Sequence, residues 1–315
     1  MIEIREYSDS DKEIWNDFNR SAKNSLFMHD RNYMDYHRDR FSDCSLMFYR
    51  DEELIALLPG CEKESSFYSH AGLTYGGFII NEKMKQKTMN ECFGELLKYA
   101  KKREWKKIVY KTIPHIYHNQ PAEEDRYALY AYGAIINTID ASTYIDLNHP
   151  LKMSKGRKAQ ISRAKREGVE VQLLEEAIHY DRFINLENEV LERRHGTRAV
   201  HTSKELKMLH DRFPENIHLY GANKKGRLIA GVVIYEYNEV LHTQYMAAND
   251  EGRVIGALDL VISLIMEKYK GRKKWLDFGI STEHGRVYLN EGLIAQKESF
   301  GGRTGVYEIW EIILP

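Results

Sequence analysis

The chain has 315 residues, enough for two domains of ordinary size, and its 43% hydrophobic and 30% charged residues are typical of a globular protein. Its 46 basic and 47 acidic residues give a net charge of −1, so anion binding requires a local basic cluster. The three cysteines form no CxxC pair, which argues against a disulfide framework or a zinc site. No segment approaches the roughly 18 apolar residues of a membrane span. We therefore expect a cytoplasmic protein with no metal ion and no integral membrane segment.

The first half of the chain shows strand, helix, hairpin, strand, helix and strand patterns in that order. Alternating apolar residues predict strands, and apolar residues three or four apart predict helices. The expected elements are a strand at 2–7, a helix through 14–18, a hairpin of 46–49 and 54–58, and a strand at 78–80, followed by a helix at 83–103 and a strand at 107–111.

The second half repeats this order. We expect strands at 143–147 and 169–173, a hairpin of 217–222 and 228–237, strands at 239–247, 274–278 and 306–313, and helices at 154–167, 177–194 and 253–270. Single helices between strands indicate a mixed α/β sheet rather than an all-parallel one. Pro150 marks a boundary near 137–150, so we expect domains at 1–140 and 141–315, with the active site in the second.

An ordered set of glycine and polar residues follows the strand at 274–278. Gly279 and Ser281 end the strand, and Lys297 and Glu298 precede a Phe-Gly pair at 300–301. Glycine at a strand end lets a substrate or a backbone approach closely, and Lys297 places a cation beside that opening. Each glycine alone is typical of an ordinary turn; as an ordered set, they favour a site.

This set, FGIS…E…G…LN…GL…KExFG, resembles the Fem-like branch of the GNAT acyltransferase superfamily, which includes the FemA and FemX type peptidyltransferases. The segment SHAGLTYGGFII resembles the family's loop before its YGG strand, and RKAQISRAKREGVEV resembles the basic helix that opens its second domain. The pattern at Lys297 is similar to the family's FKxxFG motif, with Gln296 in place of the aromatic residue. The resemblance covers essentially the whole chain. It implies two tandem GNAT-like domains and adds Tyr75 and Gly76 to Ser281 and Glu298 as substrate-binding residues.

The resemblance also points to a donor-binding loop. GNAT enzymes hold the pyrophosphate of acetyl-CoA at an R/Q-x-x-G-x-G/A turn that opens a helix. Its counterpart here would use Arg253, Val254, Gly256 and Ala257, but Leu258 replaces the last small residue. An acyl-CoA cradle and a helix start packed against the sheet both remain open. Aminoacyl-tRNA is the alternative donor, because peptidyltransferases of the Fem type do not need this loop.

A basic segment at 152–166 carries seven positive charges and no acidic residue. We expect Arg157 and Lys158 to bind a phosphate, a diphosphate or the backbone of tRNA. The alternative is a solvated helix face. The chain has no signature of sequence-specific nucleic-acid recognition, so specific DNA binding is not expected.

The candidate general base is His195, next to Arg194 at the end of a predicted helix that Gly196 terminates. A histidine can take a proton from an amine near neutral pH, and Arg194 would bind substrate from the same loop. The alternative for His195 is a structural role at the negative end of the helix dipole. His195 and His201 do not have metal-ligand spacing.

The strand at 239–247 offers a further catalytic candidate. Simple alternation puts His242 and Gln244 on one face and Thr243 and Tyr245 on the other. Tyr245, or Asp277 on the following strand, would reach the cleft, although either can be a packed sheet residue. In GNAT proteins this strand splays from its neighbour and aligns the acyl carrier.

These features predict an N-acyltransferase that moves an acyl or aminoacyl group to an amine of a small molecule, a sugar nucleotide or a cell-envelope precursor. Lys297 would stabilise charge near the leaving group. Because the chain lacks a GxSxG elbow and a catalytic cysteine motif, we expect direct transfer without a covalent acyl-enzyme. One alternative is an aminoacyl-tRNA-dependent peptidyltransferase of cell-wall synthesis. The other is a GNAT-like pair that only binds ligands.

Overall fold

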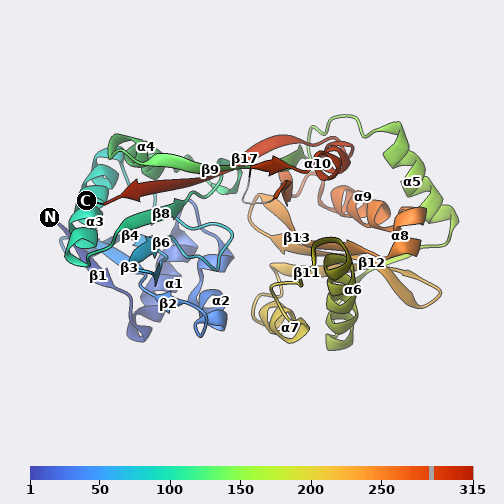
Figure 1. The fold of residues 1–315 in the computed structure, drawn as a ribbon, viewed down its shortest axis with the longest axis horizontal. Coiled ribbons are helices and arrows are strands. Elements are labelled where there is room, and N and C mark those ends of the chain that lie inside the picture. Colours follow the sequence, from blue (N-terminus) through green and yellow to red (C-terminus); the bar gives the residue numbers. More distant parts are fainter. Residues whose placement is uncertain (284–286, 315) are drawn as a thin grey trace. The chain divides into compact units, whose positions relative to one another are not determined.

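The computed structural model describes residues 1–283 and 287–314, apart from the side chains at positions 194 and 195. The chain divides into unit 1, residues 1–140 and 306–315, and unit 2, residues 141–305. It passes from unit 1 to unit 2 within strand β9 (Ile135–Asp146) and returns within β17 (Arg303–Ile313) (Figure 1). The last strand therefore packs with the first unit, whereas the sequence suggested that it belongs with the second.

Unit 1 contains two sheets and three helices of more than one turn. One sheet has the order β1-β3-β4-β7, and the other strands of the unit follow the order β17-β8-β6-β5-β2. The strands are β1 (Ile2–Glu6), β2 (Ser42–Asp43), β3 (Leu46–Arg50), β4 (Glu53–Leu58), β5 (Cys61–Lys63), β6 (Ser66–Tyr68), β7 (Ile79–Ile80) and β8 (Lys107–Lys111). The helices are α1 (Lys12–Ser21), α2 (Arg31–Met34), α3 (Gln86–Lys102) and α4 (Glu124–Ala131), of which α2 is a single turn.

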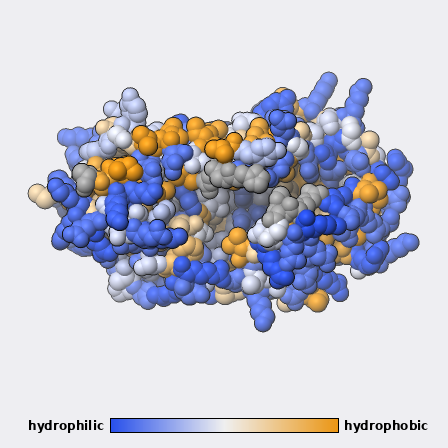
Figure 2. Space-filling model, in the orientation of Figure 1, coloured by the Kyte–Doolittle hydropathy of each residue, from blue (hydrophilic) through white to orange (hydrophobic). Residues whose placement is uncertain are grey.

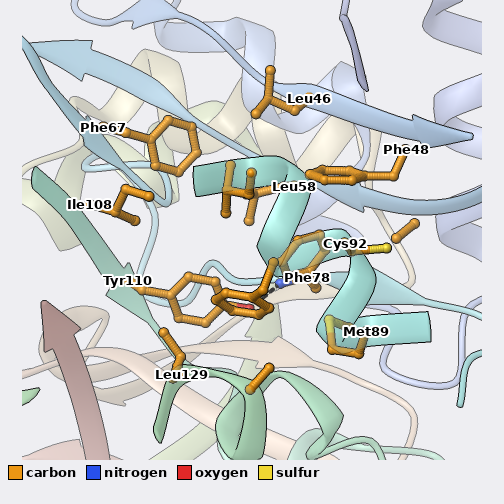
Figure 3. Close-up of a cluster of buried hydrophobic side chains, with 14 of the residues drawn as sticks. Leu46, Phe48, Leu58, Phe67, Phe78, Met89, Cys92, Ile108, Tyr110 and Leu129 are labelled. Atoms are coloured by element: carbon orange, nitrogen blue, oxygen red, sulfur yellow. Dashed lines mark hydrogen bonds between the residues drawn. The ribbon is translucent and has the colours of Figure 1, made fainter. Parts of the chain in front are cut away.

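The core of unit 1 forms where α3 lies against the strands. Met89, Cys92 and Phe93 recur at helical spacing and are fully buried, so one face of α3 is apolar. Figure 3 shows Met89 and Cys92 of α3 in one cluster with Phe78 and Tyr110. The Phe93 ring lies 5.3 Å from that of Phe78 and 6.0 Å from that of Tyr110, measured between ring centroids. The hydroxyl of Tyr110 accepts a hydrogen bond of 2.6 Å from the backbone N–H of Phe78, which satisfies two buried polar groups inside the apolar cluster.

Some apolar residues of unit 1 remain on its surface. Ile135, Ile136 and Ile139 of β9 are 59%, 43% and 50% exposed, and Tyr130 of α4 is 74% exposed. Figure 2 shows apolar side chains gathered in the region of α4 and the start of β9. Within residues 1–283 and 287–314, no helix has the length and apolar character needed to cross a membrane.

Unit 2 is built on one sheet with the strand order β10-β11-β12-β13-β14-β9. All neighbouring pairs are antiparallel except β13 and β14, which are parallel. Its strands are β10 (Glu170–Leu174), β11 (Ile217–Lys224), β12 (Arg227–Glu236), β13 (Val240–Ala248) and β14 (Trp275–Ile280), with a small ribbon of β15 (Thr282–Glu283) and β16 (Tyr288–Leu289). Its helices are α5 (Lys155–Arg166), α6 (Ala177–His195), α7 (Ser203–Arg212), α8 (Asp250–Ile255), α9 (Ala257–Tyr269) and α10 (Glu291–Glu298).

Helices cover both faces of this sheet, with α6 and α9 on opposite sides (Figure 1). On the α9 side, Ile161 of α5 joins an apolar core that includes Leu260 of α9. On the α6 side, Phe183 lies so close to Gly231 of β12 that a Cβ there would stand 2.6 Å from the ring. The predicted mixed α/β fold is confirmed. The single helix predicted at 253–270 is wrong, because Gly256 adopts φ +78° and divides it into α8 and α9.

Candidate functional site

The two parallel strands of unit 2 separate after three residue pairs. Val240 pairs with Trp275, and the register ends where His242 stands opposite Asp277. Beyond this point β13 continues with β12, whereas β14 pairs with β9 as far as Ile280. The described residues form no further β13–β14 pair. The point of divergence therefore lies at His242 and Asp277.

Asp277 is fully buried, and its carboxylate contacts Ser142, Gly279 and His242 among the described residues. Its Oδ1 accepts hydrogen bonds from the Ser142 hydroxyl at 2.7 Å and from the Gly279 N–H at 2.8 Å. Its Oδ2 lies 3.4 Å from Nδ1 of His242. Gly279 has φ +70°, and a Cβ there would lie 3.3 Å from Cε1 of His242, so this close approach requires glycine. The result is a buried carboxylate–imidazole pair with the Nε2 side of the ring toward Gly279.

Lys297 reaches the same strand end from α10. Its Nζ donates hydrogen bonds to the carbonyl oxygens of Gly279 at 2.9 Å and Ile280 at 2.6 Å, and the residue is 4% exposed. Burial lowers the pKa of Lys297 to about 8, and the negative charge of Asp277 opposes this shift. An ammonium has three donors, and the two carbonyls account for two of them. Asn290 caps α10 by accepting from the Leu293 N–H at 2.9 Å, which fixes the helix that carries Lys297.

A bulge in β13 changes which residues share a face. Tyr245 pairs with Val233, and His242 pairs with Tyr235, with a register shift in between. Val233 and Tyr235 are two residues apart on β12 and therefore point to the same side of the sheet. The extra residue at Gln244 thus brings Tyr245 to the face that carries His242. Simple alternation had predicted opposite faces, and that prediction is wrong.

A second polar group lies under α6. The Tyr245 hydroxyl lies 2.6 Å from Nδ1 of His201. Burial raises the pKa of Tyr245 to about 12, with a smaller contribution from the charge of Glu187 on α6. Glu187 is 6% exposed, and burial raises the pKa of its carboxyl to about 7.

Several buried hydroxyls of the sheet, including those of Thr143 and Thr243, have no hydrogen-bond partner among the described residues. Two more belong to Tyr144, which stands opposite Asp277 on β9, and to Ser281 just after β14. The backbone N–H of Ser281 donates to the Ala141 carbonyl at 2.7 Å, so the residue continues the line of β14. Buried hydroxyls are usually hydrogen-bonded, and unsatisfied ones near a candidate site are groups that a substrate can satisfy. Glu298, also predicted to bind substrate, lies on the last turn of α10 and is half-buried.

Arg157 of the basic helix is engaged inside unit 2. Its guanidinium forms an ion pair with Asp259, donates from Nε to the Ser299 hydroxyl at 3.0 Å, and lies 4.6 Å above the Phe300 ring. Lys158, the adjacent predicted anion ligand, is exposed. The two cations therefore have different environments: one joins α5 to α9 and α10, and the other faces solvent.

The predicted CoA loop forms the junction of α8 and α9. A Cβ at Gly256 would stand 2.7 Å from the backbone oxygen of Gln160, so α5 covers the turn closely. Arg253 is paired with Asp250, and Ala257 is fully buried. Val254, the remaining predicted contact, is 58% exposed.

A pocket of about 500 Å³ opens beside this junction and includes Arg157, Arg253 and Asp259 in its lining. Asp259 lies in the first turn of α9, where a pyrophosphate would need unopposed N–H groups. Both arginines are already paired with carboxylates, Arg157 with Asp259 and Arg253 with Asp250. These residues do not fit the pyrophosphate of CoA in the manner of the GNAT loop.

The other predicted residues lie elsewhere. Tyr75 belongs to unit 1, where its buried hydroxyl hydrogen-bonds to those of Tyr117 and Tyr307 at 2.7 Å each. Gly76 follows it, and a Cβ there would stand 1.9 Å from the backbone oxygen of Ser69. The side chains of Arg194 and His195 lie outside the described part of the structure.

Three residues of this site were missed in the sequence. His242 and Ser142 gave no signal on their own, because their roles depend on the pairing of β13, β14 and β9. Glu187 did offer one: it falls on the apolar stripe of α6, four residues after Phe183 and three after Ile184. A charged residue inside such a stripe points to a buried polar site. The described residues contain no group of three or more His, Cys, Asp or Glu side chains placed to hold a metal ion.

Comparison with known proteins concerns the fold. Residues 152–285 match the acetyltransferase (GNAT) domain family. The whole fold is similar to the crystal structure of FemX, with a TM-score of 0.67, 11% identity, and coverage of 97% of this chain and 96% of that one. It is also similar to the C-terminal domain of a putative lysylphosphatidylglycerol synthetase from Agrobacterium fabrum, with a TM-score of 0.64, 12% identity, and coverage of 96% and 91%.

A third similar structure is a tandem GNAT protein from the clavulanic acid biosynthesis pathway, with a TM-score of 0.58, 9% identity, and coverage of 100% of this chain and 99% of that one. No curated protein matches the chain by sequence. At these identities the likeness concerns the fold. The predicted resemblance to the Fem-like tandem GNAT architecture is confirmed at that level.

Proposed function

We propose that this chain, which has the tandem GNAT fold of the Fem-like type, is an N-acyltransferase that moves an aminoacyl group from aminoacyl-tRNA to an amine of a cell-envelope precursor. The observation that carries the proposal is the buried group at the divergence of β13 and β14. It combines an imidazole beside a carboxylate, His242 and Asp277, with the ammonium of Lys297 at the end of the same strand.

These groups suit attack of an amine on an ester carbonyl. The amine nitrogen forms the new C–N bond while Nε2 of His242 accepts its proton, and Asp277 stabilises the imidazolium that results. Lys297 donates its third N–H to the developing oxyanion, where a charged donor in a buried site is most effective. The ester C–O bond then breaks, and the proton held by His242 passes to the leaving oxygen of the ribose. Asp277, whose Oδ1 accepts a hydrogen bond from the Gly279 N–H, holds the imidazole in position throughout.

The choice of aminoacyl-tRNA over acyl-CoA as the donor rests on the charged side chains at the two candidate donor sites. The α8–α9 junction does not fit a CoA pyrophosphate in the manner of the GNAT loop, because the two arginines that line it are already paired, Arg157 with Asp259 and Arg253 with Asp250. The basic segment, in contrast, has six exposed cations, namely Lys152, Lys155, Lys158, Arg163, Lys165 and Arg166. Such a patch suits a polynucleotide backbone, for which affinity decreases steeply with salt. The motif resemblance to the Fem-type peptidyltransferases, which take their acyl group from aminoacyl-tRNA, favours the same donor.

The test is a transfer assay with two donors, a mixture of aminoacyl-tRNAs and acetyl-CoA, and with the same tRNA after deacylation as a control that carries no acyl group. The acceptors are peptidoglycan precursors that carry a free amine. We expect amide formation only with charged tRNA, and loss of roughly 100-fold or more in rate for Lys297→Ala, the magnitude typical of removing an oxyanion donor. Lys204→Ala, an exposed lysine on α7, is the matched control and should keep full activity.

Transfer from acetyl-CoA with no response to charged tRNA would contradict the proposed donor. If no donor supported transfer, and Lys297→Ala and the wild type behaved alike in binding both donors and the deacylated tRNA, the chain would be a binding module instead.

A further inference from the structure

Glu187 lies on the buried face of α6, next to β13. The residues that share this face, Tyr180, Phe183 and Ile184, are almost completely buried, so Glu187 replaces an apolar residue in the stripe. The residue itself is 6% exposed, and its Oε2 has no hydrogen-bond partner among the described residues. No ion pair of Glu187 is formed within the described part of the chain. A carboxylate without a cation in such a place is costly to maintain.

Two more polar side chains lie on β13, the strand against which α6 packs, and the charge of Glu187 acts on one of them, Tyr245. The Oε1 of Gln244, at the bulge of β13, is also buried and has no partner within residues 1–283 and 287–314. The hydroxyl of Tyr245 next to it is oriented by His201. The bulge aligns Tyr245 with the face that carries His242, so the two sites lie on one side of the sheet. His242 and Tyr245 are three residues apart on β13, which corresponds to a separation of about 10 Å at roughly 3.3 Å per residue.

We propose that Glu187, Gln244 and Tyr245 form a binding subsite for a primary ammonium group of the substrate. An ammonium presents three N–H donors, and the subsite offers a carboxylate, an amide oxygen and a hydroxyl. Such a ligand supplies the positive charge that the buried carboxylate lacks. The separation from His242 makes this ammonium a recognition group, distinct from the amine that attacks the carbonyl. Assigning this ammonium to the transferred aminoacyl group or to the acceptor rests on the proposed function. The binding of an amine at the subsite does not depend on that function.

The experiment measures binding directly, without turnover. L-Alaninamide carries a free ammonium next to a carbonyl group, and N-acetyl-L-alaninamide is its neutral counterpart. We expect the first to bind the wild-type protein in calorimetric titration or ligand-observed NMR, and the second to bind at least 10-fold more weakly. Glu187→Gln should lose about 10-fold or more in affinity for L-alaninamide, because a hydrogen bond to a charged partner is removed. Glu189→Gln, the same change at an exposed position of α6, is the matched control.

Equal binding of both amides, or wild-type affinity in Glu187→Gln, would overturn the subsite. A second variant, Tyr245→Phe, should weaken L-alaninamide binding while circular dichroism shows a folded protein; unchanged affinity there would remove Tyr245 from the subsite and overturn the three-oxygen arrangement. The subsite and the proposed function fail separately. Glu187-dependent binding without transfer from any donor would support the subsite and refute the transferase, whereas transfer abolished by Lys297→Ala with no Glu187 dependence of amine binding would do the reverse.

Discussion

The buried carboxyl of Glu187 makes the stability of the protein depend on pH in a predictable window. Burial raises its pKa from 4.5 to about 7. Between these values the folded state binds more protons than the unfolded state, so stability decreases as the pH rises, and the full penalty is present above pH 7. At 1.36 kcal/mol per pH unit the difference corresponds to about 3 kcal/mol. Glu187→Gln removes the titrating group and with it this dependence.

The assay is urea denaturation of the wild type and Glu187→Gln at pH 5 and pH 8. A buried amide has its own desolvation cost, which does not depend on pH. The informative quantity is therefore how the difference in the free energy of unfolding between the two proteins changes from pH 5 to pH 8. We expect the free energy of unfolding of the variant to increase by about 2.5 kcal/mol relative to that of the wild type between pH 5 and pH 8, because at pH 5 a small part of the penalty is already present. Glu189→Gln should show no such change, since this residue is exposed. If the difference in the free energy of unfolding between the wild type and Glu187→Gln were the same at pH 5 and pH 8 within about 0.5 kcal/mol, the raised pKa of Glu187 would be wrong.

Three further predictions concern other positions. Because the pKa of Lys297 is lowered to about 8, a pH–rate profile of transfer should decline above pH 8; a flat profile to pH 10 would contradict the role of its ammonium. Gly76→Ala should lower the free energy of unfolding by about 1–3 kcal/mol, because its Cβ would stand 1.9 Å from the backbone oxygen of Ser69. Arg157→Ala should cost about 3–5 kcal/mol in urea denaturation, because Asp259 would remain as a buried unpaired carboxylate.

Matched substitutions separate these effects from nonspecific ones. Gly156→Ala is the control for Gly76→Ala, since a Cβ at Gly156 meets no atom within 4 Å and alanine favours a helix. Lys158→Ala is the control for Arg157→Ala, since Lys158 is exposed on the same helix and should change stability little. If either control were as destabilised as its partner, the packing or ion-pair explanation would be wrong.

Local features of the sequence predicted much of the fold because local physics determines them. The helix expected at 154–167 is observed as Lys155–Arg166, since Ser154 accepts a hydrogen bond from the Arg157 N–H at 3.1 Å and Gly168 with φ +70° follows its end. The strands of the hairpins were recognisable for the same reason: alternation and turn residues are read within a few positions. The ordered motif around Lys297 likewise indicated the correct quarter of the chain for a buried ammonium.

Residues that act through distant partners could not be found in this way. Nothing near His242 indicates that it stands opposite Asp277, because their pairing joins two strands separated by α8 and α9. The bulge at Gln244 reverses the face expected for Tyr245, and only the register with β12 reveals it. The engagement of Arg157 by Asp259 depends on the packing of α5 against α9.

By itself, the sequence determined where many of the strands and helices form, that the sheet is mixed, and that a lysine follows the strand at 274–278. The tertiary structure decided which polar groups meet, namely the carboxylate–imidazole pair and the carbonyls that hold Lys297. It also decided that the carboxyl of Glu187 is buried. The physical reason is the distance along the chain over which each kind of interaction acts. Propensity, periodicity and capping act over a few residues, whereas strand order, register and burial arise from contacts between residues far apart in the chain.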